Sequence, residues 1–460
     1  MSVSVKGKRI LIVGLGKSGI AAFETIVREG VIPAVYDDRD IIKEDPALSE
    51  KLKKAGAESF LNGMQVPEGP WDLFVLSPGV SPSLPFIEKA RGGGVKIIGE
   101  LELAYILGRG KYIAITGTNG KTTTTTLIGE LFSAAGFNAA VCGNIGTPVV
   151  SESVRAKDDT WLVTEVSSFQ LETIESFRPK IAVLLNLTPD HMDRHKTMEK
   201  YAEAKARIYE NQEACDFFIY NADDELVTSL AAAAPSEKLP FSRRKILEKG
   251  AYVRDGMIVF ASSKNEEPVN VMRTDALMIP GLHNLENALA GAAVAFAAGI
   301  GPDTIAKTLI SFKGVEHRIE FVAEINGIRF VNDSKGTNPD ASVKAIEAIG
   351  DRILLIAGGY NKDADFSDYI RAAKGRVKKL LLIGDTAGII KECALKGGFE
   401  AKDIIMAGSM EEAVRLGYGC AGTGDTMLLS PACASWDMYK DYEERGADFK
   451  TAVKSLEARE

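Results

Sequence analysis

The sequence predicts an α/β protein of three domains, each built around a mainly parallel sheet. Three apolar, β-rich runs at 9–13, 112–116 and 352–357 end in a glycine or small-residue turn and pass into a helical pattern, which is typical of βαβ units. The length of 460 residues favours three domains at about 150 residues each. Looser segments near 90–99 and 311–315 predict domains at 1–99, 100–314 and 315–460.

Composition excludes several classes of protein. The 45% hydrophobic and 26% charged fractions are those of an ordinary globular chain, and a net charge of −8 disfavours a main role in binding nucleic acid or an anionic membrane. Five widely spaced cysteines without a CxxC pair predict neither a disulfide framework nor a zinc site, so we expect a cytoplasmic protein. The longest apolar tract, 288–300, is shorter than the roughly 20 residues that cross a bilayer, and predicts a buried helix.

The first predicted domain opens with the glycine turn GLGKSG at 14–19, and Asp37 closes its next strand. This spacing satisfies the dinucleotide fingerprint, in which the acidic residue holds a ribose hydroxyl. The same turn serves any pyrophosphate at a helix N-terminus, with Lys17 and Ser18 facing it. NAD, another diphosphate, and a glycine turn kept only for packing all remain open at this point.

The second predicted domain carries the strongest signal, GTNGKT at 117–122, between a strand and a helix. Backbone N–H groups and the helix dipole would hold phosphates, Lys121 would reach one of them, and the Thr122 hydroxyl would meet Mg²⁺. The pattern departs from the general P-loop, because Ile115 occupies the position of its first glycine. The alternative is a glycine turn followed by a solvated lysine.

Two further strands of this domain end in groups able to bind metal. Glu165 follows the strand WLVT and is a candidate Mg²⁺ ligand, and His191 lies in LNLTPDHMDRH. Since Mg²⁺ prefers oxygen, the alternative for His191 is a capped or satisfied loop histidine. Lys205, in YAEAKARIY, has the pattern of an exposed helix lysine.

Polar groups also gather in GLHNLEN, EHRIE and NDSKGTN, near the second predicted boundary and beyond. Asn284 and Asn287 would share one helix face and either cap the helix or contact a ligand. His317 and Arg318 would form a surface pair or a clamp on phosphate.

Taken together, eight segments resemble the Mur ligases through all three predicted domains. They are GTNGKTTT, EVSSFQLE, LNLTPDHMDRH, YAEAKARIY, GLHNLENALA, EHRIEF, NDSKGTNPDA and LSPACASWDMYKDYEERG. The NDSKGTN and SPACASWD segments favour the branch of the family that adds D-glutamate. The resemblance implies an ATP-dependent ligase that joins D-glutamate to UDP-N-acetylmuramoyl-L-alanine through an acyl phosphate, during peptidoglycan precursor synthesis.

The resemblance also implies a role for each domain: an N-terminal Rossmann-like domain for the UDP substrate, a central P-loop-type ATPase domain, and a C-terminal Rossmann-like domain for the amino acid. It implies ATP and two Mg²⁺ ions as cofactors and a monomer with small-molecule substrates. Because acyl phosphates hydrolyse, we expect the C-terminal domain to close over the central one about a hinge near 312–318.

Site residues follow from the resemblance position by position. Contacts to the UDP substrate are expected from Gly16, Lys17, Ser18, Asp37, Asp38, Arg39, Ser77, Gly79 and Asn144. Contacts to ATP are expected from Gly117, Thr118, Asn119, Gly120, Lys121, Thr122, Thr123, Asn287, Arg318, Asp333 and Lys335. The D-glutamate site would comprise Thr337, Lys362, Ser430 and Tyr442, the last standing where the family more often has Phe. The metal ligands would be Thr122, Glu165, His191 and a carbamylated Lys205, and the catalytic residues Lys121, His191, Lys205 and Lys362.

Two rival functions remain. An NAD-dependent oxidoreductase would use the turn at 14–19 and Asp37, but would leave the second glycine loop and the metal-type residues without a role. A nucleotide-binding regulator without catalysis would keep the fold and the ligands.

Overall fold

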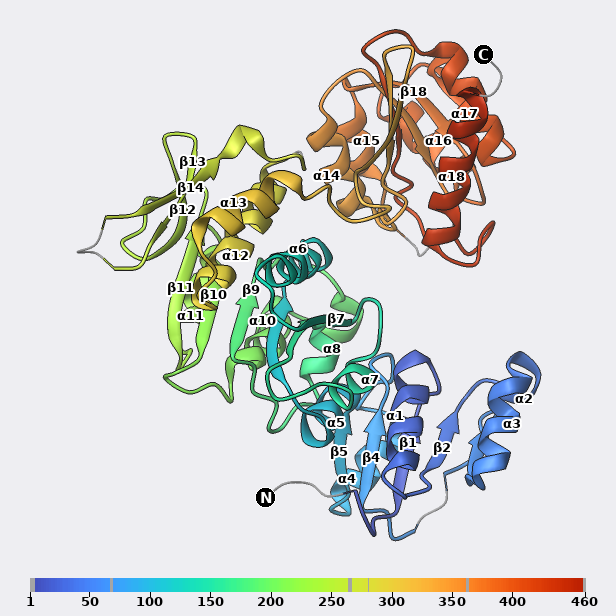
Figure 1. The fold of residues 1–460 in the computed structure, drawn as a ribbon. Helices are drawn as coiled ribbons and strands as arrows, with labels where there is room; N and C mark the ends of the chain where they lie inside the picture. Colours follow the sequence, from blue (N-terminus) through green and yellow to red (C-terminus); the bar gives the residue numbers. More distant parts are fainter. Residues whose placement is uncertain (1–4, 67–68, 264–266, 280, 361–363, 458–460) are drawn as a thin grey trace. The chain divides into compact units, whose positions relative to one another are not determined.

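A computed structural model describes residues 5–66, 69–263, 267–279, 281–360 and 364–457. These residues form two compact units, the first comprising 1–276 with 286–310 and the second 277–285 with 311–460. The first unit contains two sheets and the second contains one (Figure 1). The predicted domain boundaries at 99/100 and 314/315 stay predictions.

The first sheet has five parallel strands in the order β3-β2-β1-β4-β5. Its strands are β1 (Ile10–Val13), β2 (Ala34–Asp37), β3 (Ser59–Leu61), β4 (Leu73–Leu76) and β5 (Lys96–Gly99). Its helices are α1 (Lys17–Arg28), α2 (Ile41–Glu44), α3 (Pro46–Ala55), α4 (Pro85–Gly92) and α5 (Glu100–Leu107). Side chains alternate along β1, so Ile12 packs in the same core as Phe23 of α1, while Val13 packs with Ile87 of α4. Burial on both faces explains the continuous apolar strands.

The second sheet has nine strands in the order β14-β13-β12-β11-β10-β9-β6-β8-β7. Pairing is parallel from β7 through β12, and β12, β13 and β14 pair antiparallel. The strands are β6 (Lys111–Thr116), β7 (Ala139–Gly143), β8 (Trp161–Glu165), β9 (Ile181–Leu184), β10 (Phe217–Asn221), β11 (Glu237–Ser242), β12 (Gly250–Arg254), β13 (Met257–Ala261) and β14 (Val269–Arg273). The helices are α6 (Lys121–Ala134), α7 (Val149–Ser153), α8 (Ser168–Leu171), α9 (Met192–His195), α10 (Met198–Ala206), η1 (Arg207–Tyr209), α11 (Glu225–Ala231), η2 (Thr274–Ala276), α12 (Leu282–Ala297) and α13 (Pro302–Ser311). This topology brings the ends of β6, β8 and β9 to one edge of the sheet.

The third sheet has six strands in the order β15-β16-β20-β17-β18-β19, parallel except for β15. The strands are β15 (Glu320–Ile325), β16 (Ile328–Asn332), β17 (Ile353–Ala357), β18 (Val377–Leu382), β19 (Ile404–Met406) and β20 (Thr426–Leu429). The helices are α14 (Pro339–Ile349), α15 (Ser367–Ala373), α16 (Ala387–Lys396), η3 (Ala401–Asp403), α17 (Met410–Cys420) and α18 (Tyr442–Glu457). Helices α14 to α16 pack on one face, with Leu355 in the shared core, and α17 and α18 pack on the other, with Ile356.

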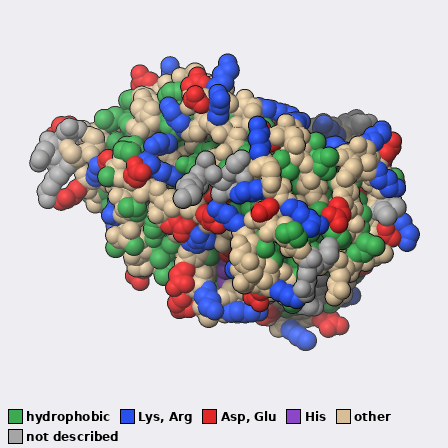
Figure 2. All heavy atoms as spheres, turned by 90° about the horizontal axis from the view of Figure 1, so that it is seen from below, with side chains coloured by type: hydrophobic (Ala, Val, Ile, Leu, Met, Phe, Trp, Pro, Cys, Tyr) green, Lys and Arg blue, Asp and Glu red, His purple; other side chains and the backbone are tan. Residues whose placement is uncertain are grey.

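The apolar tract 288–300 lies mostly in the buried helix α12, as predicted, but the helix ends at Ala297. Gly299 follows with φ +82°, a left-handed conformation that terminates helices. Within the described residues, no helix has both the length and the apolar character needed to span a bilayer. Figure 2 shows cationic and anionic side chains interspersed over the visible face, without a broad basic area.

Candidate active site

The glycine loop joins β6 to α6 and leaves the start of the helix open. Gly120 is the N-cap of α6, and no side chain caps the helix there. Its φ is +85°, and a Cβ at this position would lie 2.4 Å from Asn287 Oδ1. Asn287 also accepts a hydrogen bond from Thr124 at 3.2 Å, so it fixes α12 against the loop. An uncapped helix N-terminus with this close backbone turn is compatible with the predicted phosphate site, which stays a prediction.

The remaining loop residues hold the loop in place. Thr118 Oγ1 accepts a hydrogen bond from Thr188 N at 3.0 Å and lies 3.2 Å from the Tyr201 hydroxyl. Asn119 N donates to Asn186 Oδ1 at 2.8 Å. The polar side chains of Thr118 and Asn186 therefore fix the loop, and its phosphate-binding groups would be backbone N–H groups and Lys121.

Two lysine ammonium groups meet at one carbonyl of this loop. Lys121 Nζ donates to Gly117 O at 3.0 Å and to Thr118 O at 2.8 Å. Lys205 Nζ, from α10, donates to the same Gly117 O at 2.9 Å and lies 3.3 Å from Thr116 Oγ1. Two cations on one acceptor repel each other, and this arrangement favours the uncharged form of one of them.

The expectation of an exposed Lys205 from its helical pattern was wrong. Its side chain is only 2% exposed, and its ammonium group points to the loop over the Tyr201 ring. Burial and the nearby charge of Lys121 hold the pKa of Lys205 well below its usual value. The flanking alanines gave no sign of this, because the residues that bury Lys205 come from other parts of the chain.

Glu165, at the end of β8, is a buried carboxylate with one unpaired oxygen. Its Oε1 accepts from Asn144 Nδ2 at 2.9 Å, and its backbone carbonyl accepts from Asn144 N at 2.9 Å. Its Oε2 is buried and has no hydrogen-bond partner within the described part of the chain. The charge of Glu165 is close enough to Lys205 to raise the pKa of that lysine, against the larger lowering by burial. A buried carboxylate oxygen without a donor is costly unless a cation or ligand pairs with it.

The predicted metal ligands differ in how they are placed. Thr122 is buried in the first turn of α6. His191 precedes α9 in a left-handed conformation, with φ +54° and its ring 4.8 Å from that of Phe169. Among the described residues, no three His, Cys, Asp or Glu side chains form a group that could hold a metal ion. Any ion here would need oxygen donors of other kinds as well.

Sequence reasoning missed a buried histidine that links two of these segments. His195 Nε2 lies 2.9 Å from Ser168 Oγ, so α9, which follows His191, is tied to α8, which follows Glu165. The Nδ1 atom of His195 lies 3.6 Å from Glu172, and burial lowers the pKa of His195. In the sequence, this contact was signalled only by the final His of the segment DHMDRH. Its partner Ser168 lies 27 positions away, so no local pattern joins the two residues.

In the first sheet, Asp37 and Ser77 brace the glycine turn at 14–19. Asp37 Oδ2 accepts from Leu15 N at 2.6 Å and from Arg39 at 2.9 Å, and Oδ1 accepts from the backbone and side chain of Arg39 at 3.0 and 2.9 Å. Although burial opposes it, these bonds hold the pKa of Asp37 below its usual value. Ser77 Oγ donates to Gly14 O at 2.7 Å, and a Cβ on Gly19 would lie 1.8 Å from that oxygen.

These contacts argue against the dinucleotide interpretation of the turn. A carboxylate has about four acceptor positions, and Asp37 already uses them, so it is not available to hold ribose hydroxyls. Gly16 is the uncapped N-cap of α1, and Lys17 is exposed beside it. Asp38, Arg39 and Gly79 are exposed as well.

In the second unit, three predicted nucleotide contacts lie together. Asp333 Oδ1 accepts from Ile319 N at 3.3 Å, and Lys335 N donates to His317 O at 3.0 Å, so both are joined to the turn that carries Arg318. Burial raises the pKa of Asp333 to about 7, and the nearby charge of Arg318 opposes this rise.

The predicted D-glutamate contacts are more dispersed. Ser430 is fully buried and its hydroxyl donates to Asp333 Oδ2 at 2.7 Å. Tyr442 is half-buried, and its ring lies 5.5 Å from Lys335 Nζ. Thr337 is also half-buried, with its N–H donating to Lys335 O at 2.9 Å. Lys362 lies outside the described residues.

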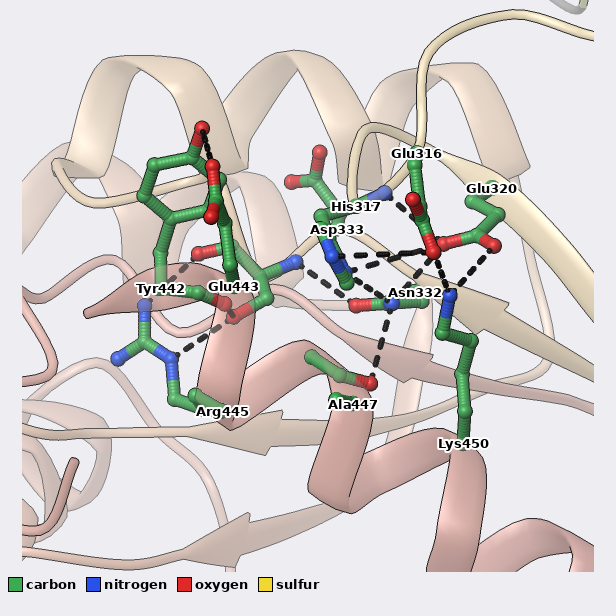
Figure 3. Close-up of polar contacts among 12 residues, drawn as sticks. Glu316, His317, Glu320, Asn332, Asp333, Tyr442, Glu443, Arg445, Ala447 and Lys450 are labelled. Atoms are coloured by element: carbon green, nitrogen blue, oxygen red, sulfur yellow. Dashed lines mark hydrogen bonds and ion pairs between the residues drawn. The ribbon is translucent and has the colours of Figure 1, made fainter. Parts of the chain in front are cut away.

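Arg445 was missed as an individual residue. It is 1% exposed at the start of α18, and its guanidinium donates to Ser334 Oγ and Ser334 O at 3.0 and 2.8 Å (Figure 3). It also donates to the carbonyls of Cys433 and Ala434. Arg445 thus ties the NDSKGTN segment to the SPACASWD segment through one buried cation.

Three family models match this chain, one after another along the sequence. Residues 8–99 match the Mur ligase MurD-like N-terminal domain, 115–295 the Mur ligase middle domain, and 317–433 the Mur ligase glutamate ligase domain. The chain belongs to the Mur ligase family. This Mur ligase is 49% identical to the UDP-N-acetylmuramoylalanine--D-glutamate ligase of Caldanaerobacter subterraneus subsp. tengcongensis, covering 99% of this chain and 100% of that one. It is 50% identical to the ligase of the same name from Pelotomaculum thermopropionicum, covering 98% of each chain.

Solved structures show the same fold. The UDP-N-acetylmuramate-alanine ligase MurC from Thermotoga maritima aligns with a TM-score of 0.59 at 19% identity, covering 98% of this chain and all of that one. The MurF ligase of Thermotoga maritima in complex with ADP aligns with a TM-score of 0.57 at 17% identity, covering 84% of this chain and 96% of that one. The predicted three-part Mur ligase architecture and the predicted family are confirmed.

Proposed function

We propose that this Mur ligase joins the amine of D-glutamate to the carboxyl group of UDP-N-acetylmuramoyl-L-alanine, at the expense of ATP, in peptidoglycan precursor synthesis. The observation that carries the proposal is the identity of 49% and 50% to two D-glutamate ligases over nearly the whole chain. The two glycine turns support the proposal, since one would bind the diphosphate of the UDP substrate and the other the triphosphate of ATP.

The first step would be attack of the substrate carboxylate on the γ-phosphorus of ATP, which forms an acyl phosphate and releases ADP. The loop N–H groups would orient the triphosphate, and Lys121 would leave its two loop carbonyls to pair with the transferring phosphoryl group. The amine of D-glutamate would then attack the acyl carbon, and inorganic phosphate would leave. We assign Lys362 to the incoming carboxylate and His191 to positioning the amine, with no base assigned.

Two residues support a magnesium site. Glu165 Oε2 is a buried oxygen with no partner among the residues that the structure describes, and Thr122 lies in the first turn of the helix that follows the glycine loop. Bound Mg²⁺ would neutralise charge on the phosphates. The predicted set of Thr122, Glu165, His191 and Lys205 remains a proposal, as does the number of ions.

Lys205 is suited to carbamylation because its amine is buried and disfavours a proton. The uncharged amine adds to CO₂, a C–N bond forms, and one proton is released, leaving an anionic carbamate. This change would turn a repelling cation beside Lys121 into an attracting anion with oxygen donors.

The remaining assignments extend the same proposal. Arg318, Asp333, Lys335 and Asn287 would contact the nucleotide, and Thr337, Ser430 and Tyr442 would serve the D-glutamate site. At the D-glutamate site, Ser430 would act indirectly by holding the carboxyl group of Asp333, to which its hydroxyl already donates a hydrogen bond. A monomer in the cytoplasm remains our prediction.

The test offers UDP-N-acetylmuramoyl-L-alanine and ATP with D-glutamate, L-glutamate, L-alanine or meso-diaminopimelate in parallel, and reads the product mass. Only D-glutamate should give a product. With ¹⁸O placed in the substrate carboxylate, the label should appear in the released phosphate. Product from another amino acid would refute the substrate, and unlabelled phosphate would refute the acyl phosphate. Nucleotide binding without ATP turnover or amide product in any of these assays would instead favour the regulator without catalysis.

A further inference from the structure

The turn at 316–320 has a strained backbone around Arg318. His317 has φ +64° and Ile319 has φ +46°, on either side of it. A β-branched residue rarely adopts this left-handed conformation, so contacts from outside the turn must maintain it. Strain on both sides of Arg318, a residue that we propose contacts the nucleotide, suggests that the turn has a functional role.

The turn is joined directly to the proposed nucleotide contacts of the second unit. The carbonyl oxygen of His317 accepts a hydrogen bond from Lys335 N, and the N–H of Ile319 donates a hydrogen bond to Asp333 Oδ1. The charge of Arg318 acts on both Asp333 and His283, and it contributes to lowering the pKa of His283 to about 4, an effect due first to burial. Arg318 therefore lies among the groups with which we expect it to bind the nucleotide.

Asn332, at the end of β16, holds the turn from inside the domain. Its buried Nδ2 lies 2.9 Å from His317 Nδ1, 3.0 Å from Glu320 Oε2 and 3.3 Å from Gly446 O. Glu320 Oε2 also accepts from His317 N at 2.8 Å. Figure 3 shows Asn332 at the centre of these contacts, between the turn and α18.

Lys450 holds the turn from the outside. It extends from α18 and pairs with Glu316 at the start of the turn and with Glu320 Oε1, at 3.2 Å, at its end (Figure 3). The side chains of Lys450 and Glu320 are only 21% and 22% exposed, so this pair is less screened than a surface pair. Although burial opposes it, the two carboxylates raise the pKa of Lys450.

We propose that Lys450 is a positioning residue for nucleotide binding: by bridging Glu316 and Glu320 it keeps the left-handed turn closed and Arg318 aligned with Asp333 and Lys335. This inference rests on the proposed nucleotide role of Arg318. Lys450 itself does not touch the nucleotide in this proposal, and it acts through the turn.

The test compares Lys450→Met with Lys454→Met, which removes the same charge from an exposed position of the same helix. Affinity for ADP is measured by titration calorimetry, and KM and kcat are measured for each substrate. Lys450→Met should weaken ADP binding and raise KM for ATP by about fivefold, because Arg318 loses its alignment. KM for D-glutamate and for the UDP substrate should stay at the wild-type value, and Lys450→Arg should restore ADP affinity.

Two results would overturn the proposal. One is ADP affinity in Lys450→Met equal to that in Lys454→Met, even with a lower melting temperature, since Lys450 would then only stabilise the fold. The other is an equal rise in KM for all three substrates. If Lys450→Met does not fold, Glu316→Gln removes the Lys450–Glu316 pair, leaves the bonds of Glu320 to His317 and Asn332 in place, and should also weaken ADP binding.

Arg318→Ala separates this proposal from the one on which it rests. It should weaken ADP binding, and adding Lys450→Met should then have no further effect. Wild-type ADP affinity in Arg318→Ala would refute the nucleotide contact itself. Weakened binding in Arg318→Ala but not in Lys450→Met would refute the positioning role alone.

Discussion

Glu100→Gln should stabilise the first compact unit at alkaline pH. Glu100 is 2% exposed on α5, and its Oε1 accepts from Val150 N at 2.6 Å. Its Oε2 is buried and has no hydrogen-bond partner in the described part of the chain. Burial raises the pKa of Glu100 from 4.5 to about 7. The folded chain therefore keeps a proton that the unfolded chain releases.

The sign of the pH dependence follows from this difference. Between pH 4.5 and about 7 the unfolded state loses the proton of Glu100 while the folded state keeps it, so stability falls as pH rises and is level above that window. The pKa difference corresponds to a loss of about 3 kcal/mol in the free energy of unfolding. Glutamine copies the protonated acid, because its carbonyl can accept from Val150 N, and it cannot ionise.

Urea unfolding at pH 5 and pH 8, followed by circular dichroism, measures this effect in the transition of the first unit. The variant should match the wild type within about 1 kcal/mol at pH 5 and exceed it by about 3 kcal/mol at pH 8. The same difference at both pH values would show that Glu100 does not titrate in this window, and would refute the reasoning.

Glu102→Gln is the matched control, two positions further along the same helix. The Glu102 carboxylate accepts backbone N–H groups from Glu175, Ser176 and Phe177 at 2.8 to 2.9 Å. An amide nitrogen cannot accept these bonds, so this variant should lose about 1–3 kcal/mol at pH 8. If both variants changed the free energy of unfolding in the same direction at pH 8, the contrast between the poorly bonded Glu100 and the fully bonded Glu102 would be wrong.

Three further predictions concern the proposed active site. Lys121→Ala should abolish ATP turnover while calorimetry shows unchanged binding of UDP-N-acetylmuramoyl-L-alanine, and equal loss of both would contradict separate sites. Lys205→Ala should be inactive but partly rescued by added acetate or formate in a rate assay, whereas full activity would make Lys205 dispensable. Gly120→Ala should weaken ADP binding at least about tenfold in calorimetry, because its Cβ would lie 2.4 Å from Asn287 Oδ1. Wild-type affinity would show that the loop readily moves away.

Local sequence patterns were sufficient for several strands and for the two glycine loops. The predicted β-rich runs at 9–13, 112–116 and 352–357 correspond to β1, β6 and β17, and the loop at 117–120 lies between β6 and α6. Both features are encoded in short stretches of sequence, namely a continuous apolar run for a strand buried on both faces and glycines that adopt positive φ in the loop. The Mur ligase architecture was also predicted from the sequence, because its motifs recur in a fixed order.

The environment of individual side chains was decided by the tertiary structure. Lys205 has the local pattern of a solvated lysine, yet it is buried against a loop nearly 90 positions away. Asp37 has the spacing of a ribose-binding acid, yet Leu15 N and Arg39 occupy its oxygens. Glu100 and Glu102 are near neighbours with opposite expected responses to the same substitution. Burial and charge depend on what packs around a group, and the chain brings those partners together only when the sheets form.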